Sequence, residues 1–218
     1  TVFVEQGSKT IKINEAGPQI STEECKAFER MLLEQAQKGG FVVLAGKNPP
    51  GIDGKMTIDL LLKAKKAGAK IVVDSESLTL EEVVALGPTL IKPNELEFSK
   101  MLGRPLDTYE ALIQAAREVV AQGVEYVVIS MGGDGLLGIS AREAYKVDVP
   151  KIQVRSTVGA GDSVVAGTLM ALSQGKSFRD AICTGAAFGS AMASTDGTEI
   201  PPRALVEEIL SHVTCRNM

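Results

Sequence analysis

The chain alternates short apolar runs with longer amphipathic segments. Apolar runs of strand length occupy residues 41–45, 70–74 and 124–130. Residues 58–67 and 108–122 instead place apolar side chains three and four positions apart, which predicts helices. Strands that alternate with helices through short loops predict an α/β fold on a mainly parallel sheet covered on both faces.

Both ends of this pattern carry further elements. Residues 1–5 and 9–14 alternate apolar and polar side chains around Gly7-Ser8, which predicts a hairpin or two edge strands. The Ser-Thr-Glu-Glu run at 21–24 predicts the start of a helix that reaches about Lys38. Later in the chain, residues 144–149 are predicted to form another edge strand, and three helices are predicted after residue 163.

Composition narrows the classes of function. The chain has 218 residues, of which 44% are hydrophobic and 23% charged, as in ordinary globular proteins. A net charge of -4 without a basic cluster argues against a nucleic-acid partner. There is no apolar run of about 18 residues, so no membrane span is expected. The three widely spaced cysteines predict reduced thiols and a cytoplasmic location rather than a disulfide framework or a metal cluster.

The candidate chemistry centres on the sequence Ser-Thr-Val-Gly-Ala-Gly-Asp-Ser at 156–163, which opens a long helical pattern. The first amides of a helix have no internal partner and carry partial positive charge. With no side chains at Gly159 and Gly161, an anion such as phosphate can approach those amides closely. Asp162 is then either a base aimed at a hydroxyl that attacks the phosphate, or an ordinary charge at a helix N-terminus.

Two more motifs accompany this one: KPNELE at 92–97 and SMGGDG at 130–135. Together with TVGAGDS they resemble the ribokinase-like carbohydrate kinases, over nearly the whole chain and in the same order. The resemblance is strongest to the branch that phosphorylates phosphosugars, namely 1-phosphofructokinase, tagatose-6-phosphate kinase and the minor 6-phosphofructokinase. It implies a three-layer αβα fold with a mainly parallel sheet and a small β lid.

The resemblance also implies a division of the chain. Residues 1–14 would be part of the β lid, which covers the sugar and offers an interface for a homodimer; the residues alone equally allow a hairpin packed on the main sheet. Residues 15–218 would form the nucleotide-binding and catalytic domain. Relatives carry further strands and a sugar-binding loop upstream that cannot be found here. Because Thr1 is not a Met and the first residues already read as strand, the chain is expected to begin inside a longer protein.

The resemblance assigns roles to the residues of these motifs. Asp162 would accept the hydroxyl proton, and the amides of Gly159, Ala160 and Gly161 would stabilise the transferred phosphoryl group. ATP would be bound by a second set: Lys92, Ser130, Gly132, Gly135, Thr157 and Ser190. The small side chains around Ser190 permit either close helix packing or a flat pocket for adenine.

Metal ions are implied as well. Asn94 and Glu97 share one face of a first helical turn, which is the pattern of a plain capping box. The resemblance implies that they also hold Mg²⁺ through water, since Mg²⁺ uses few protein ligands. A monovalent cation, K⁺, would bind near Ser156, Val158 and Gly197.

The residues that would contact the sugar phosphate match the family pattern less closely. Lys47 stands in a loop at the carboxyl end of a strand, where ligands bind in α/β sheets. Relatives usually have Ser there to contact the sugar phosphate. Lys can pair with phosphate too, although a surface Lys in a turn is the other interpretation. Asp74, at another strand end, either caps the next helix or lies near the metal and phosphates.

The resulting prediction is an ATP-dependent transfer of phosphate to a primary hydroxyl of a phosphorylated ketohexose. The candidate substrates are fructose 1-phosphate, tagatose 6-phosphate and fructose 6-phosphate. The alternative is a nucleotide-binding protein that is catalytically incomplete or not an enzyme. The missing sugar loop and Lys47 favour the alternative, whereas a carboxylate at Asp162 beside the phosphates favours catalysis.

Overall fold

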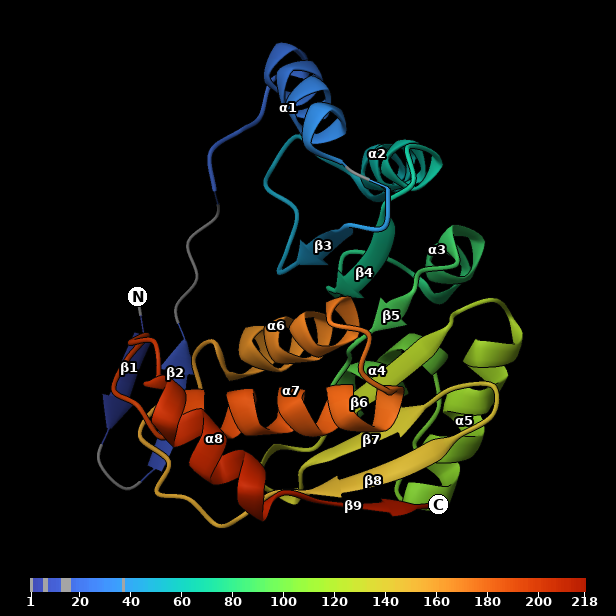
Figure 1. The fold of residues 1–218 in the computed structure, drawn as a ribbon. Helices are drawn as coiled ribbons and strands as arrows, with labels where there is room; N and C mark the ends of the chain where they lie inside the picture. The colour runs from blue at the N-terminus through green and yellow to red at the C-terminus, as the bar shows by residue number, and fades with distance from the viewer. Residues whose placement is uncertain (1, 6–7, 13–16, 37) are drawn as a thin grey trace. The chain divides into compact units, whose positions relative to one another are not determined.

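The computed structural model describes residues 2–5, 8–12, 17–36 and 38–218. Seven strands follow one another across a sheet in the order β3-β4-β5-β6-β7-β8-β9 (Figure 1). The pairs from β3 to β6 are parallel, and β8 pairs with β9 antiparallel. The predicted mainly parallel sheet is therefore confirmed. The strands are β3 (Phe41–Ala45), β4 (Lys70–Asp74), β5 (Leu90–Ile91), β6 (Tyr126–Ser130), β7 (Leu136–Ile139), β8 (Ala144–Asp148) and β9 (Thr214–Asn217).

The chain divides into two compact units. The first contains Ala16–Val127 and Ile139–Ala141. The second contains Val128–Gly138, Arg142–Met218 and the N-terminal hairpin.

The first unit is built from β3, β4 and β5 with their connecting helices. The apolar centre of β4 is fully buried, as expected of a parallel strand covered on both faces. Capping boxes start three of the helices, at Ser21, Thr79 and Asn94. The helices are α1 (Thr22–Gln35), α2 (Gly54–Lys66), α3 (Leu80–Leu86), α4 (Glu95–Leu102) and α5 (Tyr109–Ala121).

Two expectations for this unit need correction. Helix α1 ends at Gln35 rather than near Lys38, because Ala36 already has extended backbone and no residue of α1 is buried to hold a further turn. Asp74 does not cap the helix that follows it, because the cap of α3 is Thr79, whose hydroxyl accepts from the Glu82 N–H.

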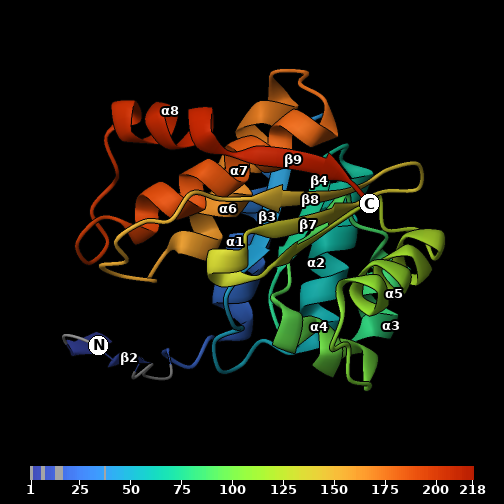
Figure 2. The same ribbon diagram turned by 90° about the horizontal axis from the view of Figure 1, so that it is seen from below.

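The second unit contains β8, β9 and three helices after the glycine-rich loop, as predicted. The helices are α6 (Ala160–Ser173), α7 (Phe178–Ala193) and α8 (Arg203–His212). Residues 144–149 do not form an edge strand, because β9 pairs with β8 on its outer side, with Lys146 opposite Arg216. Figure 2 shows β9 running beside β8. Strand β9 was missed because its sequence, Thr-Cys-Arg-Asn, is short and polar.

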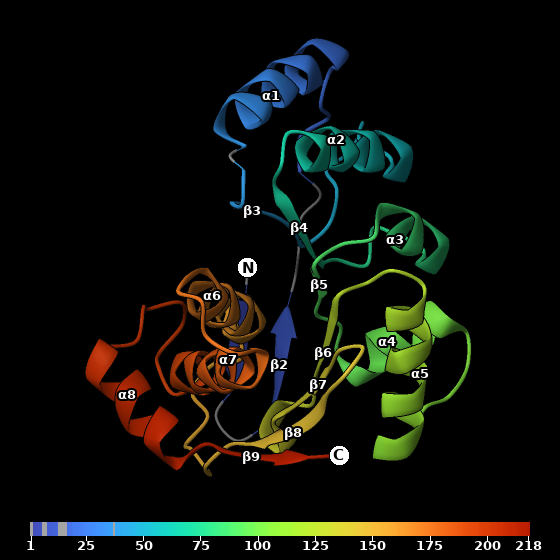
Figure 3. The same cartoon turned by 45° about the vertical axis from the view of Figure 1, so that its right-hand side comes forward.

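Helices α6 and α7 lie side by side at unusually close range (Figure 1). A Cβ atom added to Gly185 on α7 would lie 2.1 Å from Thr168 Oγ1 on α6, and one added to Gly189 would lie 2.5 Å from Val164 Cγ2. The small side chains of α7 therefore do permit close helix packing. On another side of α7, Ala187 and Ala191 pack against α8, which lies beside α7 in Figure 3.

The N-terminal strands β1 (Val2–Glu5) and β2 (Ser8–Lys12) form an antiparallel pair, so the predicted hairpin is confirmed for the described residues. Its predicted turn at Gly7 and the end of its second strand at 13–14 lie outside the described residues. Within the part of the chain that the structure describes, no helix is both long and apolar enough to cross a bilayer.

Candidate functional site

A cavity of about 470 Å³ lies within the second unit. Its wall combines three stretches that are far apart in the sequence: the turn after β6, the glycine-rich loop with the first turn of α6, and the last two turns of α7. Seven of the residues predicted from the motifs line this one cavity: Ser130, Gly132, Gly135, Thr157, Ala160, Gly161 and Ser190. The structure thus brings the predicted nucleotide residues of this unit together.

The glycine-rich loop becomes a helix as the sequence suggested. Gly159 is the N-cap of α6, with φ +75°, a left-handed conformation that favours glycine. No side chain caps this helix end. Because the first N–H groups of a helix have no intrahelical acceptor, the end of α6 offers donors and a positive dipole to an anion. Ala160 and Gly161 at this end line the cavity.

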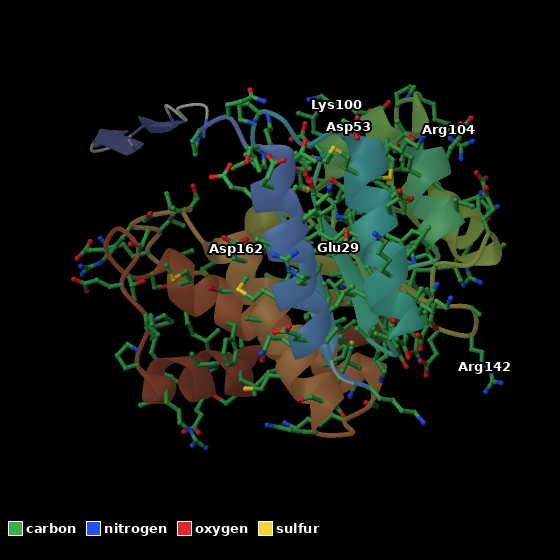
Figure 4. The ribbon with its side chains drawn as sticks, turned by 90° about the horizontal axis from the view of Figure 1, so that it is seen from above. Glu29, Asp53, Lys100, Arg104, Arg142 and Asp162 are labelled. Atoms are coloured by element: carbon green, nitrogen blue, oxygen red, sulfur yellow. The ribbon has the colours of Figure 1, made fainter. Side chains whose placement is uncertain are left out.

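Asp162 stands one residue beyond these glycines, in the first turn of α6 (Figure 4). Its side chain is exposed rather than packed into the helix bundle. A carboxylate in the first turn of a helix interacts favourably with the positive end of the helix dipole. The position suits a base that acts on a group held at the end of α6.

The opposite wall is a tight turn after β6. Residues Gly132–Asp134 form one turn of 3₁₀ helix, closed by the Gly135 N–H donating to the Gly132 carbonyl at 3.1 Å. The Met131 N–H donates to the Gly135 carbonyl at 2.9 Å. This geometry needs glycine at 135, where φ is +82° and a Cβ atom would lie 2.0 Å from the Val147 carbonyl oxygen. The turn thus presents bare backbone to the cavity.

The third wall comes from α7. Ala186, Gly189, Ser190 and Ala193 face the cavity, and Ser190 is itself buried. Small side chains leave a flat surface there, so close packing on α6 and a flat cavity wall occur on the same helix. Close helix packing is thus confirmed, whereas a pocket for adenine at this wall stays a prediction.

The residues proposed for a monovalent cation occupy the loops next to this helix end. The Ser156 hydroxyl accepts from the Val158 N–H at 3.2 Å, and the Ser156 side chain is buried. An exposed ion pair, Arg155 to Asp196 at 2.7 Å, joins this loop to the turn that contains Gly197. The loop is held further by the Arg155 N–H, which donates to the Ala193 carbonyl at 2.8 Å.

Lys92 lies in the first unit and pairs with Asp74, for which the sequence left two roles open. The register of β4 and β5 places Val73 opposite Ile91, so Asp74 and Lys92 follow at the carboxyl ends of adjacent strands. Lys92 Nζ lies 3.1 Å from Asp74 Oδ1, and the two side chains are 6% and 15% exposed. Asp74 therefore holds a buried lysine.

Asn94 and Glu97 form a complete capping box at the start of α4. Asn94 Oδ1 accepts from the Glu97 N–H at 2.9 Å, and Glu97 Oε2 accepts from the Asn94 N–H at 2.8 Å. Because each carboxylate oxygen has two lone pairs, this bond does not prevent Glu97 from also binding a hydrated ion. Among the described residues, no group of three or more His, Cys, Asp and Glu side chains is placed to hold a metal directly.

Lys47 is an exposed side chain on a loop that is itself well held. The Asn48 N–H donates to Ser77 Oγ at 3.1 Å, and Asn48 Nδ2 donates to Thr57 Oγ1 at 2.8 Å. The hydroxyl of Ser75 donates to the Gly46 carbonyl. These bonds tie the loops after β3 and β4 together, so Lys47 projects from a fixed backbone.

Sequence reasoning missed part of the cavity. Leu136, Val149, Pro150, Lys151, Ile152 and Val154 also line it. Residues 149–154 have no regular structure, so no period revealed their inward face. No sequence pattern marks these residues, and only the structure shows that the apolar side chain of Val154 is exposed.

Comparison with known proteins agrees with the motifs. A family model described as pfkB family carbohydrate kinase matches residues 1–204. The 1-phosphofructokinase of Bacillus subtilis is 34% identical over 212 residues, which cover 97% of this chain and 69% of that protein. The ATP-dependent 6-phosphofructokinase isozyme 2 of Escherichia coli is 30% identical over 98% of this chain and 69% of the relative.

Solved structures support the same family. The phosphofructokinase-2 of Escherichia coli in complex with substrates and products has a TM-score of 0.87 at 30% identity, over 94% of this chain and 66% of that one. That enzyme has also been solved in complex with potassium and as a tetrameric inhibited form. The predicted ribokinase-like α/β fold is thereby confirmed, and the chain spans about two thirds of the length of these relatives.

Proposed function

The chain belongs to the pfkB family of carbohydrate kinases, and from that premise we propose that it transfers the γ-phosphate of ATP to a primary hydroxyl of a phosphorylated ketohexose. One observation carries the proposal. The uncapped end of α6, the glycine turn after β6 and the small-residue face of α7 line a single cavity. Donors for phosphates, bare backbone for a ribose and a flat wall for a base are thus present together.

The roles within that cavity follow from its chemistry. The α7 face near Ser190 receives the adenine, and Ser130, Gly132 and Gly135 contact the ribose and phosphates. The N–H groups at Gly159, Ala160 and Gly161 bind the transferred phosphoryl group. Fixed donors aimed at developing charge are a large source of rate enhancement in phosphoryl transfer.

Asp162 is the proposed base. When the acceptor hydroxyl attacks the γ-phosphorus, its oxygen forms a bond to phosphorus, and its proton passes to the Asp162 carboxylate. The bond from the γ-phosphorus to the bridging oxygen breaks, so that ADP leaves. Thr157, on the cavity wall at the start of the loop, contacts the nucleotide phosphates in this arrangement.

Two cations are part of the proposal. Asn94 and Glu97 hold Mg²⁺ through its water shell, which fits a capping box whose carboxylate has further lone pairs. Mg²⁺ supplies neutralisation of phosphate charge when it is bound. A K⁺ ion binds the loop that contains Ser156 and Val158, together with the turn at Gly197. Support for K⁺ comes from the potassium complex of the Escherichia coli relative.

The acceptor is proposed to be fructose 1-phosphate, fructose 6-phosphate or tagatose 6-phosphate. Lys47 contacts its phosphate, because an exposed ammonium on a fixed loop at a strand's carboxyl end suits that group. Lys92, held by Asp74, contacts the nucleotide phosphates. The hairpin of β1 and β2 is proposed as part of a β lid over the sugar, and as the interface of a homodimer.

The test is the substitution Asp162→Asn in the 218-residue chain. Asn keeps the size of the side chain but accepts no proton at neutral pH, so turnover should fall about 10² to 10⁴-fold. Affinity for ATP should stay within a few-fold of the parent chain. A coupled assay with the three sugar phosphates measures turnover, and titration calorimetry measures ATP binding.

The matched control is Asp180→Asn, which changes the same side chain in the first turn of α7, where Ser177 caps the helix. It should retain full turnover. Equal turnover in the Asp162 variant and the parent chain would exclude the base role. A parent chain that binds ATP but phosphorylates none of the three sugars would favour a nucleotide-binding protein without catalysis.

A further inference from the structure

Lys146 is a charged side chain in the interior of the second unit. It lies on β8 and is only 1% exposed. Lysine is almost never fully buried unless its ammonium is paired, because transfer of an unpaired charge out of water is very costly. The contacts of this ammonium therefore indicate what it does.

The ammonium of Lys146 binds three oxygens. It donates to the carbonyl of Asp134, to Asp148 Oδ1 at 2.8 Å and to the Val147 carbonyl at 3.3 Å. The second oxygen of Asp148 lies 3.3 Å from Arg216 Nη1 on β9. The Asp148 carboxylate thus supplies the negative charge that a buried lysine needs.

The contact with Asp134 joins β8 to the turn after β6. A peptide group is planar, and its carbonyl and N–H point in opposite directions. When Lys146 holds the Asp134 carbonyl, it therefore sets the direction of the Gly135 N–H, which donates to the Gly132 carbonyl at 3.1 Å and closes the 3₁₀ turn. The backbone of Gly135 also lies directly against the Val147 carbonyl.

This turn is one wall of the cavity described above, through Gly132, Gly133 and Gly135. Its residues carry little side-chain packing of their own, because three of the five from 131 to 135 are glycine and 132–134 are exposed. An unsupported glycine turn would sample many conformations and would pay the entropy of ordering when a ligand binds. Lys146, on β8, holds the glycine turn in this conformation before a ligand binds.

We propose that Lys146 is a positioning residue for the nucleotide: its buried ammonium holds the Asp134 peptide so that the glycine turn is already in the form that contacts ribose and phosphate. This inference rests on the assignment of the cavity to a nucleotide. Lys146 does not touch the ligand, and it acts through the backbone of residues 132–135.

The predicted consequence is a loss of nucleotide affinity without loss of chemistry. Lys146→Met keeps the length and apolar stem but removes the ammonium. Its Kd for a non-hydrolysable ATP analogue should rise about tenfold or more, and its KM for ATP should rise in parallel. The kcat at saturating ATP should stay within about threefold, because the end of α6 is unchanged.

Arg216→Met is the matched control. It removes the other cation next to Asp148 but leaves the bond to the Asp134 carbonyl intact. It should lower thermal stability to a similar or smaller extent and leave the Kd for the analogue unchanged. A lysine with only a structural role would instead give two variants that lose stability and bind the analogue as the parent does, which would overturn the proposal.

A Lys146→Met chain that does not fold would be replaced by Lys146→Arg. Arginine keeps the charge, but its larger planar head group cannot occupy the place of an ammonium beside the Asp134 carbonyl. Its Kd should rise at least threefold, and an unchanged Kd would also overturn the proposal. The parent chain is titrated first. If it binds no analogue, then the nucleotide assignment itself fails, and that result differs from equal binding by parent and variant.

Discussion

At the residue scale, the chain contains buried charges whose partners decide what they can do. Lys92 and Asp74 come from adjacent strand ends and pair at 3.1 Å with little exposure. A buried ion pair contributes only modestly to the free energy of unfolding. Removal of one member, however, leaves an uncompensated charge in the interior and is strongly destabilising. Lys92 is thus both a proposed phosphate ligand and a residue whose position depends on Asp74.

This dependence predicts a coupling free energy. Asp74→Asn should destabilise the chain by about 3 to 5 kcal/mol, because Lys92 loses its carboxylate. Adding Lys92→Met to that variant should recover a large part of the loss, since no charge then remains buried. Denaturant unfolding of the parent, both single variants and the double variant measures the cycle. Strictly additive losses would show that the two residues do not act as a pair.

A second residue-scale feature is a neutral thiol. Burial raises the pKa of Cys183 from the ordinary value of 9.0 to about 12, and the nearby Cys215 thiol adds to the rise. The folded chain then binds a proton that the unfolded chain releases. Stability from this group is complete below about pH 9 and disappears as the pH rises toward about 12.

Cys183→Ala should therefore flatten the loss of stability on the alkaline side. Unfolding free energies of the parent and variant, compared from pH 8 to pH 11, should converge as the pH rises, because the variant has no thiol to ionise. Burial and a hydrogen bond with Glu143 also raise the pKa of Tyr145, so Tyr145→Phe is the appropriate comparison. A pH-independent difference between parent and Cys183→Ala would contradict the assignment.

At the element scale, the close contact of α6 with α7 depends on glycine residues, which have no side chain. Gly185 faces Thr168 Oγ1 and the Val164 carbonyl, and a Cβ atom there would lie 2.1 and 2.7 Å from them. In a close-packed interior such overlap forces the helices apart.

Gly185→Ala is consequently expected to destabilise the chain by about 1 to 3 kcal/mol, although alanine favours helix formation. Because the same two helices line the cavity, affinity for the ATP analogue should fall as well. Thermal unfolding and calorimetry provide the two measurements. Adding Thr168→Ala removes the nearer contact and should restore part of the stability. A Gly185→Ala chain that is more stable than the parent would mean that the helices can separate without cost.

Elements with a strong local signal were predictable. The capping boxes at Ser21 and Asn94 and the glycine start of α6 follow from two to four neighbouring residues, and the structure has all three. Strand β9 was not predictable, because its identity depends on pairing with β8 some seventy residues earlier rather than on its own sequence. The burial of Lys146 was missed for a related reason: lysine is ordinarily exposed, and the contacts with the Asp134 carbonyl and the Asp148 carboxylate that compensate its charge appear only in the folded chain.

At the scale of the whole molecule, the motifs predicted the family and seven of the residues that line the cavity. They come from three separate stretches, namely Ser130 with Gly132, Thr157 with Gly161, and Ser190, and the structure places them around one space. The role of residues 149–154 in the cavity wall could not be predicted, because a loop without periodicity gives no sign of which side faces a ligand. Pairing between distant residues, such as Asp74 with Lys92, requires strand register, which hydrophobic patterns alone do not specify.

The cavity draws its whole lining from residues 130–193, whereas Lys47, Lys92, Asn94 and Glu97 all precede residue 98. In the proposed assignment, the adenine and ribose contacts therefore lie in one continuous segment of the gene, whereas the sugar-phosphate contact Lys47 is encoded far upstream of it. Exchange of the short segment around residue 47 with that of a relative would then alter the contact to the sugar phosphate and leave the wall of the nucleotide cavity unchanged. Such modular inheritance would let a lineage diversify its carbohydrate diet without rebuilding its energy source.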